Sequence, residues 1–286
     1  MGKNGKILLC SDLDRTIIPN GYQPESPKAR PLLRQLAKRP EVMLVYVTGR
    51  DKSLITDAIT TWDLPMPDIA VGDVGTAIYS VDGVADTPLF VEWTDWKKEI
   101  AADWNGKNRA DLAQMLAGFD MLRLQAPETQ KDYKLSFYAD ANADLNALAE
   151  KIKTRLLENG VHASVITSID EMAGNGLVDI LPARATKVHA IYYIVEKLSI
   201  DESRVVYAGD SGNDLPALTS GLKAVVVKNA SEEVCRQAIE ISSQKGFDSN
   251  LYLAEGGFLE MNGNYSAGVL EGLAYFMPEI QQWLQP

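Results

Sequence analysis

The chain has 286 residues, which suits one large domain or a core domain that carries a smaller insert. Its formal net charge of −11 argues against nucleic acid or an anionic membrane as a partner, because either would require a basic surface. No apolar run approaches the roughly 20 residues of a membrane span. Residues 1–6 are polar and lack the regions typical of a signal peptide, and the two cysteines form no metal-binding pattern, so we expect a cytoplasmic protein with reduced thiols.

The first third of the chain alternates apolar runs with helical segments. Strands are predicted over 7–10, 42–47 and 69–71, helices over 27–38 and 51–62, and a hairpin with its turn at 82–83 over 76–84. A strand–helix–strand order of this kind is typical of a parallel sheet with helices on both faces.

The same alternation returns late in the chain, after a middle section of different character. The late segments are helices over 188–198, 214–220, 232–241 and 267–276, with strands over 204–208 and 224–227. The middle section has helical residues 93–119, whose continuity at Gly106 is left open, a helix over 143–158, and strands over 134–139, 162–167 and 177–181. The sequence therefore predicts an α/β fold, with a doubly wound parallel sheet core over 1–86 and 182–286 and an inserted α+β cap domain over 87–181.

Two carboxylates follow the first predicted strand directly. Asp12 and Asp14 are separated by one residue, so both can face one site at the carboxyl edge of a parallel sheet. One can be a nucleophile and the other a general acid and base. A carboxylate that attacks phosphorus forms an aspartyl phosphate, whereas the alternative interpretation is a solvated acidic turn.

Two further features can bind a phosphate group. Thr48, Gly49 and Arg50 follow the second strand, where a hydroxyl group and the N–H groups of a helix N-terminus make a phosphate site, although turn and cap chemistry is an equal alternative. Lys187 falls directly after the insert, near the start of a helix. Its ammonium group can neutralise a nucleophilic carboxylate and a phosphoryl group together, although an isolated lysine is most often a solvated surface charge.

A glycine-rich acidic loop follows the strand over 204–208. It runs from Gly209 to Asp214 and contains Asp210 and Asn213. Glycines allow a tight loop, and the carboxylate and amide oxygens are the hard ligands that Mg²⁺ prefers. The loop therefore predicts a magnesium site, with an acidic turn as the alternative.

The order of these four features, Asp-x-Asp-x-Thr, Thr-Gly-Arg, Lys and Gly-Asp-x-x-Asn-Asp, resembles the haloacid dehalogenase superfamily of phosphohydrolases. The resemblance implies a Rossmann-like core, and one subgroup of that superfamily carries a large α/β cap between the second and third motifs, where this chain has its insert. A likeness to the sucrose-6-phosphate phosphatase family extends over 11–14, 133–138, 178–182, 209–214 and 268–271.

The resemblance implies that Asp12 attacks phosphorus, while Asp14 protonates the leaving sugar oxygen and later deprotonates water. It assigns Mg²⁺ to Asp12, the main-chain carbonyl of Asp14, Asp210 and, in close support, Asp214 and Asn213. The candidate phosphate contacts are Thr48, Gly49, Arg50, Lys187 and Asn213. Arg15 stands where glycine is frequent in the superfamily, and because its side chain is large we expect it to point away from the metal.

Substrate choice is expected to lie in the insert, since sugar recognition needs donors and acceptors in fixed geometry. The candidate sugar contacts are Gln130, Lys134, Asp179 and Arg184, of which Lys134 and Arg184 are the foremost by resemblance. Their alternative interpretation is surface charge and a salt bridge at the domain junction.

The resemblance implies hydrolysis of sucrose 6-phosphate with Mg²⁺ as the cofactor. Three alternatives stay open: a phosphatase for mannosylfructose, glucosylglycerol or mannosylglycerate phosphate, a phosphomutase, and a non-catalytic domain that binds a sugar-phosphate synthase. A synthase partner stays open for an active enzyme as well, and a monomer is the default expectation.

Overall fold

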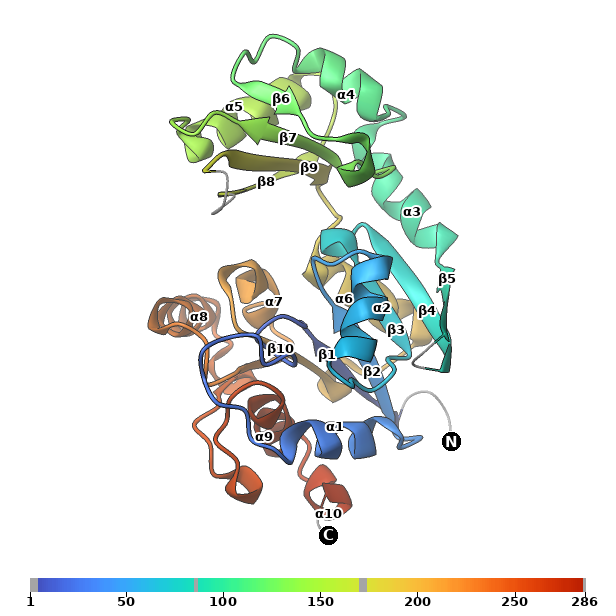
Figure 1. Ribbon diagram of the computed structural model, residues 1–286, viewed down its shortest axis with the longest axis vertical. Coiled ribbons are helices and arrows are strands. Elements are labelled where there is room, and N and C mark those ends of the chain that lie inside the picture. Colours follow the sequence, from blue (N-terminus) through green and yellow to red (C-terminus); the bar gives the residue numbers. More distant parts are fainter. Residues whose placement is uncertain (1–4, 85–86, 170–173, 285–286) are drawn as a thin grey trace. The chain divides into compact units, whose positions relative to one another are not determined.

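The computed structural model describes residues 5–84, 87–169 and 174–284 (Figure 1). Its contacts divide the chain into two compact units, one formed by residues 1–92 and 187–286 and the other by residues 93–186. Residue 86, where the first segment of the predicted core ends, lies outside the described residues. Within the described ranges, no helix is long and apolar enough to cross a membrane.

A sheet of eight strands runs through the first unit, in the order β12-β11-β10-β1-β2-β3-β4-β5 among the residues described. The strands are β1 (Ile7–Ser11), β2 (Val42–Val47), β3 (Ile69–Gly72), β4 (Ala77–Val84), β5 (Thr87–Glu92), β10 (Val205–Gly209), β11 (Lys223–Val226) and β12 (Leu251–Leu253). Neighbours from β12 to β3 are parallel, and β4 and β5 add to that edge in antiparallel pairs. With β1 near the middle, this order confirms the predicted doubly wound core.

Helices cover both faces of this sheet. They are α1 (Ala29–Ala37), α2 (Lys52–Thr61), α6 (Lys187–Leu198), α7 (Leu215–Leu218), α8 (Glu232–Lys245), α9 (Ser266–Phe276) and α10 (Ile280–Leu284). Residues of α1, α2, α9 and α10 form one hydrophobic core with Ile7 and Leu9 of β1. Leu8 and Cys10 alternate to the opposite face and are buried as well. Burial on both faces explains why β1 is apolar without alternation.

The structure places β5 in the core sheet, although the sequence assigned residues 87–92 to the insert. β4 continues through the predicted turn, because Asp82 pairs with Leu89 and Gly83 with Pro88. The insert therefore begins after β5, and the second unit starts at Trp93.

The second unit is built on a four-stranded antiparallel sheet in the order β6-β7-β9-β8, within the described residues. Its elements are α3 (Thr94–Ala101), α4 (Arg109–Met115), β6 (Leu122–Leu124), β7 (Leu135–Ala139), α5 (Leu145–Glu158), β8 (Ala163–Ile169) and β9 (Gly176–Pro182). Leu112 of α4 and Leu148, Ile152 and Leu156 of α5 share a core with these strands. The predicted α+β character of the insert is confirmed.

The helical stretch 93–119 is broken in the structure near the glycine where continuity was left open. Asn105 and Gly106 both have left-handed φ angles, of 50° and 75°, which end the preceding helical turn. Asn108 and Asp111 then form a capping box that begins α4. Asn108 and Asp111 are residue types typical of a helix start, so the sequence contains a signal for the new helix as well as for the break.

Candidate active site

Asp12 and Asp210 each follow a strand, and the two strands are neighbours in the sheet. β1 pairs in parallel with β10, with Ser11 opposite Ala208, and the N–H of Asp12 donates to the carbonyl oxygen of Ala208 at 2.9 Å. Both aspartate side chains are buried. The sheet thus brings the first and last sequence features to one carboxyl edge.

Lys187, the first residue of α6, extends its ammonium group between two buried carboxylates. Nζ donates to Oδ1 of Asp12 and Oδ1 of Asp214, both at 2.7 Å, and to Oδ1 of Asn213 at 3.4 Å. Burial alone would lower the pKa of Lys187, but Asp12 and Asp214 raise it above its ordinary value. Lys187 is therefore a buried cation in an ion cluster and not a solvated surface charge.

The buried cluster contains more negative than positive charge. Carboxylate oxygens of Asp12, Asp210 and Asp214, one from each, lie within 4.8 Å of one another. Burial raises the pKa of Asp12 to about 7, although Lys187 opposes that shift. Burial and the neighbouring Asp214 raise the pKa of Asp210 to about 6. Three carboxylates that face one ammonium group fit a hard divalent cation such as Mg²⁺.

Asp214 orients the glycine-rich loop, since hydrogen bonds use both of its oxygens. Oδ1 accepts from Lys187 and from the hydroxyl of Tyr207 at 2.5 Å. Oδ2 accepts from the N–H groups of Asp210 and Ser211, at 3.1 and 3.0 Å, and from the Ser211 hydroxyl at 2.9 Å. Burial favours the neutral form, but Lys187 and these donors hold the pKa of Asp214 below its usual range. Asp214 therefore holds the main chain at Asp210 and Ser211 in place.

Gly209 allows Asp214 to approach the end of β10. A Cβ atom at Gly209 would lie 2.7 Å from both Cβ and Cγ of Asp214, whereas one at Gly212 would meet nothing within 4 Å. Gly209→Ala is therefore expected to lower the free energy of unfolding by about 1–3 kcal/mol, because the loop must shift. Gly212→Ala in the same loop is the matched control and should stay within about 0.5 kcal/mol. Urea unfolding of both variants tests this, and equal stabilities would contradict the close approach.

Asp14 and Arg50 form a bidentate ion pair beside the buried cluster. Arg50 Nε donates to Oδ2 of Asp14 at 2.8 Å and Nη2 to Oδ1 at 2.6 Å, while Nδ2 of Asn20 donates to Oδ1 at 2.8 Å. Burial favours the neutral form, but these hydrogen bonds lower the pKa of Asp14. The Thr48 hydroxyl accepts the N–H of Arg50 at 3.2 Å. The structure thus pairs Arg50 with Asp14, and its phosphate contact stays a prediction.

Arg15 does not point away from the predicted metal ligands, so that expectation is wrong. Its Nε lies 3.4 Å from Oδ2 of Asp210, whose Oδ1 accepts the Thr16 hydroxyl at 3.0 Å. The expectation considered only the size of the side chain. A long arginine stem can carry its charged end back to a carboxylate while the stem stays partly in solvent.

Two of the four candidate sugar contacts lie together in the second unit. Ser136 of β7 is opposite Asp179 of β9, and its hydroxyl donates to Oδ1 of Asp179 at 2.6 Å. Lys134, just before β7, places Nζ 3.2 Å from Oδ2 of the same carboxylate. All three lie on the side of the sheet away from Leu135 and Phe137, which belong to the core under α4 and α5.

The other two candidates bond within the unit itself. Oε1 of Gln130 accepts the N–H of Ser136 at 2.9 Å, and Nε2 donates to the carbonyl oxygens of Ser136 and Gln125. Arg184 donates from Nε and its main-chain N–H to Asp103, at 2.8 and 2.7 Å, and pairs with Glu99. A salt bridge was the alternative interpretation of Arg184, and contact with a sugar stays a prediction for both residues.

Tyr207 and Asn20 support the site but were not among the candidates. Tyr207 lies inside β10, where an aromatic residue in an apolar run is typical of a core position. Asn20 precedes Gly21, a pair typical of a turn. No signal in the sequence distinguishes their hydrogen bonds to Asp214 and Asp14 from these ordinary roles.

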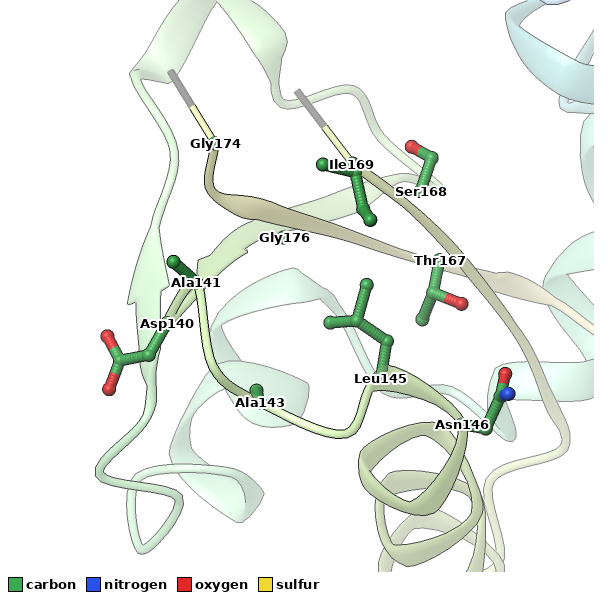
Figure 2. A pocket seen from close by; sticks show the side chains of 10 residues that line it. All are labelled: Asp140, Ala141, Ala143, Leu145, Asn146, Thr167, Ser168, Ile169, Gly174 and Gly176. Atoms are coloured by element: carbon green, nitrogen blue, oxygen red, sulfur yellow. The ribbon is translucent and has the colours of Figure 1, made fainter. Parts of the chain in front are cut away.

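A pocket of about 690 Å³ lies in the second unit, where the ends of β7, β8 and β9 meet the start of α5 (Figure 2). Its polar side chains are Asp140, Asn146, Thr167 and Ser168, among small and apolar neighbours. None of the described residues that line it is a candidate from the sequence. The pocket therefore contains none of the residues that the sequence predicts to act in catalysis, metal binding or substrate binding.

Comparisons with known proteins cover nearly the whole chain. The sequence profile of the sucrose-6F-phosphate phosphohydrolase family matches residues 5–277. A protein of Nitrosococcus oceani described as a HAD-like hydrolase is 52% identical over 280 residues, 98% of this chain and 74% of that protein. Probable sucrose-phosphatase 2 of Arabidopsis thaliana is 28% identical over 275 residues, 92% of this chain but only 60% of that protein. A glucosylglycerol-phosphate synthase of Pseudomonas anguilliseptica is 28% identical over 235 residues, 81% of this chain and 27% of the synthase.

A solved structure matches almost the whole chain. The sucrose-phosphatase of Synechocystis sp. PCC6803, in complex with sucrose and phosphate, aligns with a TM-score of 0.71 and 26% identity over 96% of this chain and 98% of that one. The profile, the fold and the order of the four motifs agree, and they confirm the family that the sequence motifs indicated. The chain therefore belongs to the sucrose-6F-phosphate phosphohydrolase family, a family of haloacid dehalogenase-like phosphatases.

Proposed function

We propose that the chain is a Mg²⁺-dependent phosphatase that hydrolyses sucrose 6-phosphate through an aspartyl phosphate on Asp12. The observation that carries the proposal is the buried cluster in which Lys187 lies 2.7 Å from Asp12 beside Asp210 and Asp214. A buried carboxylate with an ammonium group at this distance fits a nucleophile whose phosphoryl adduct needs positive charge. Membership of the family and the likeness to a sucrose-phosphatase support the choice of substrate.

Asp12 would attack with Oδ2, because Lys187 occupies Oδ1 and Oδ2 has no hydrogen-bond partner within the described residues. Attack forms the Asp12–phosphorus bond and breaks the bond from phosphorus to the sugar oxygen, which takes a proton from the Asp14 carboxyl. Water then attacks phosphorus, its proton passes to the Asp14 carboxylate, and phosphate leaves with Asp12 regenerated. Asp14 must leave its pair with Arg50 to exchange these protons.

Positive charge for the phosphoryl group would come from Lys187 and from Mg²⁺. The residues that would hold the ion are Asp12, Asp210 and the main-chain carbonyl of Asp14, with Asp214 fixing the loop. When bound, the ion supplies the charge that offsets the phosphate oxygens. Thr48, Gly49 and Asn213 are the further phosphate contacts in this proposal, and Thr48 and Asn213 already bond to Arg50 and Lys187.

The second unit would select the sugar through Lys134 and Asp179, whose side chains are partly exposed. Lys134→Ala is expected to lower kcat/KM for sucrose 6-phosphate about tenfold or more, because it removes a charged donor and leaves Asp179 without its ion pair. Activity on a small aryl phosphate should change much less. Lys153→Ala, which removes a lysine paired with Glu150 on α5, is the matched control. Equal losses on both substrates would contradict a sugar contact.

A phosphatase for another sugar or polyol phosphate is the second candidate, because the chain also aligns with part of a glucosylglycerol-phosphate synthase. A phosphate-release screen with Mg²⁺ over sucrose, mannosylfructose, glucosylglycerol and mannosylglycerate phosphates, ranked by kcat/KM, decides between them. Release from sucrose 6-phosphate at least tenfold faster than from the others supports the first candidate. Co-purification with a sugar-phosphate synthase would test a partner.

A further inference from the structure

Arg15 is held in an unusual main-chain conformation at the edge of the buried cluster. Its φ angle is 58°, in the left-handed region that few residues other than glycine and asparagine adopt readily. The main-chain N–H donates to Oδ1 of Asn20 at 2.8 Å, and the carbonyl oxygen accepts Nδ2 of Asn229 at 2.6 Å. Both main-chain polar groups are therefore fixed by side chains.

Asn229 connects Arg15 to the core of the first unit. It is buried, and its Oδ1 accepts the N–H of the buried Tyr265 at 2.7 Å. Its own carbonyl oxygen accepts Nη2 of Arg15 at 3.4 Å. Asn229 thus contacts both the main chain and the guanidinium group of Arg15, so the direction of the side chain is set by the fold.

The guanidinium group fixed in this way lies between solvent and the buried Asp210. Nε is 3.4 Å from Oδ2 of Asp210, and the exposed fractions of the two side chains are 45% and 4%. The carboxylates of Asp12, Asp14, Asp210 and Asp214 together face the cations Lys187, Arg50 and Arg15. Without Arg15 the group would carry one more unit of uncompensated negative charge.

We propose that Arg15 is a fixed counter-cation for Asp210 that weakens the binding of the divalent ion and strengthens the binding of phosphate. The inference rests on the proposed magnesium site. A cation beside a metal-binding carboxylate repels the incoming ion, and the same charge attracts a dianionic phosphate. Removing it should therefore shift the two affinities in opposite directions. Arg15 acts through its charge on Asp210 and takes no part in the proton transfers.

The test measures binding of Mg²⁺ alone to the whole chain by titration calorimetry, without substrate. Arg15→Asn removes the charge and suits the left-handed conformation. We expect its dissociation constant for Mg²⁺ to fall about two- to fivefold, and that for inorganic phosphate at saturating Mg²⁺ to rise by a similar factor. Both shifts should shrink in high salt, since the side chain is partly exposed.

Two further variants separate a local effect from a change in overall charge. Arg15→Lys keeps the charge and should stay nearer the wild type in both titrations. Arg34→Gln removes the same charge from α1, where Arg34 pairs with Asp63, and should change neither. Unchanged Mg²⁺ affinity in Arg15→Asn, or shifts of both ligands in one direction, would overturn the inference. Failure of the wild-type chain to bind Mg²⁺ would instead refute the proposed metal site.

Discussion

Replacing Asp12 by asparagine is expected to lower the rate of phosphate release by a factor on the order of 10⁵ while the protein stays folded. The amide is nearly the same size as the carboxylate but cannot form the acyl phosphate. The buried cluster would lose one of its three close carboxylates, and Lys187 would keep Asp214 as its ion-pair partner. The fold should therefore survive a change that removes the nucleophile.

Phosphate release under saturating Mg²⁺ measures the activity, and near-ultraviolet circular dichroism with urea unfolding measures the fold. Asp120→Asn changes an exposed aspartate of the second unit in the same way, so it is the matched control and should retain normal turnover. Asp14→Asn keeps the nucleophile, so it should slow turnover without preventing phosphorylation of Asp12. Turnover of Asp12→Asn within tenfold of the wild type would contradict a nucleophilic role for Asp12.

The sequence was sufficient to predict the core sheet because of how parallel strands are buried. β1 and β2 are apolar runs without alternation, which is typical of strands covered on both faces. Polar residues that end such strands must meet at one edge, so Asp12 and Asp210 could be placed together without coordinates. β5 could not be assigned in this way. Its alternating exposure fits an edge strand of either sheet, and only its pairing with β4 decides between them.

The contacts of long side chains at the site could not be predicted. Arg50 and Arg15 each reach a carboxylate that lies far from them in the chain, on Asp14 and Asp210 respectively. Such contacts depend on rotamers and on the left-handed conformation of Arg15, neither of which a motif specifies. Motif spacing therefore located the carboxylates and Lys187, and left the arginine partners of Asp14 and Asp210 undetermined.

Polar side chains of the insert show a second limit of the sequence. Gln130 was a candidate because sugar recognition needs donors and acceptors in fixed geometry, but its amide bonds to the main chain of Ser136 and Gln125. Lys134 and Asp179 bond to each other and stay partly exposed. A pattern of residue types cannot distinguish a side chain that braces its own strand from one that can meet a ligand.

Replacing Lys187 by methionine should lower both activity and stability, for related reasons. Methionine keeps the length of the side chain but removes the charge that pairs with Asp12 and Asp214. Removing one partner of a buried ion pair typically lowers the free energy of unfolding by about 3–5 kcal/mol, because the other partner stays buried without a compensating charge. Here the carboxylates of Asp12 and Asp214 would be left in that state. Loss of one contact to the developing phosphoryl charge should lower kcat/KM about 10²- to 10³-fold in the fraction that is folded.

The two effects are separable, which makes the prediction a test of the cluster as well as of the mechanism. Urea unfolding gives the stability, and assays at low temperature, corrected for the folded fraction, give kcat/KM. Lys153→Met on the exposed face of α5 controls for the substitution. If activity fell while stability changed by less than about 1 kcal/mol, Lys187 would act on the substrate alone, and the buried carboxylates would not depend on it in the folded protein. Because Lys187 bonds to both Asp12 and Asp214 at 2.7 Å, we expect the two losses to appear together.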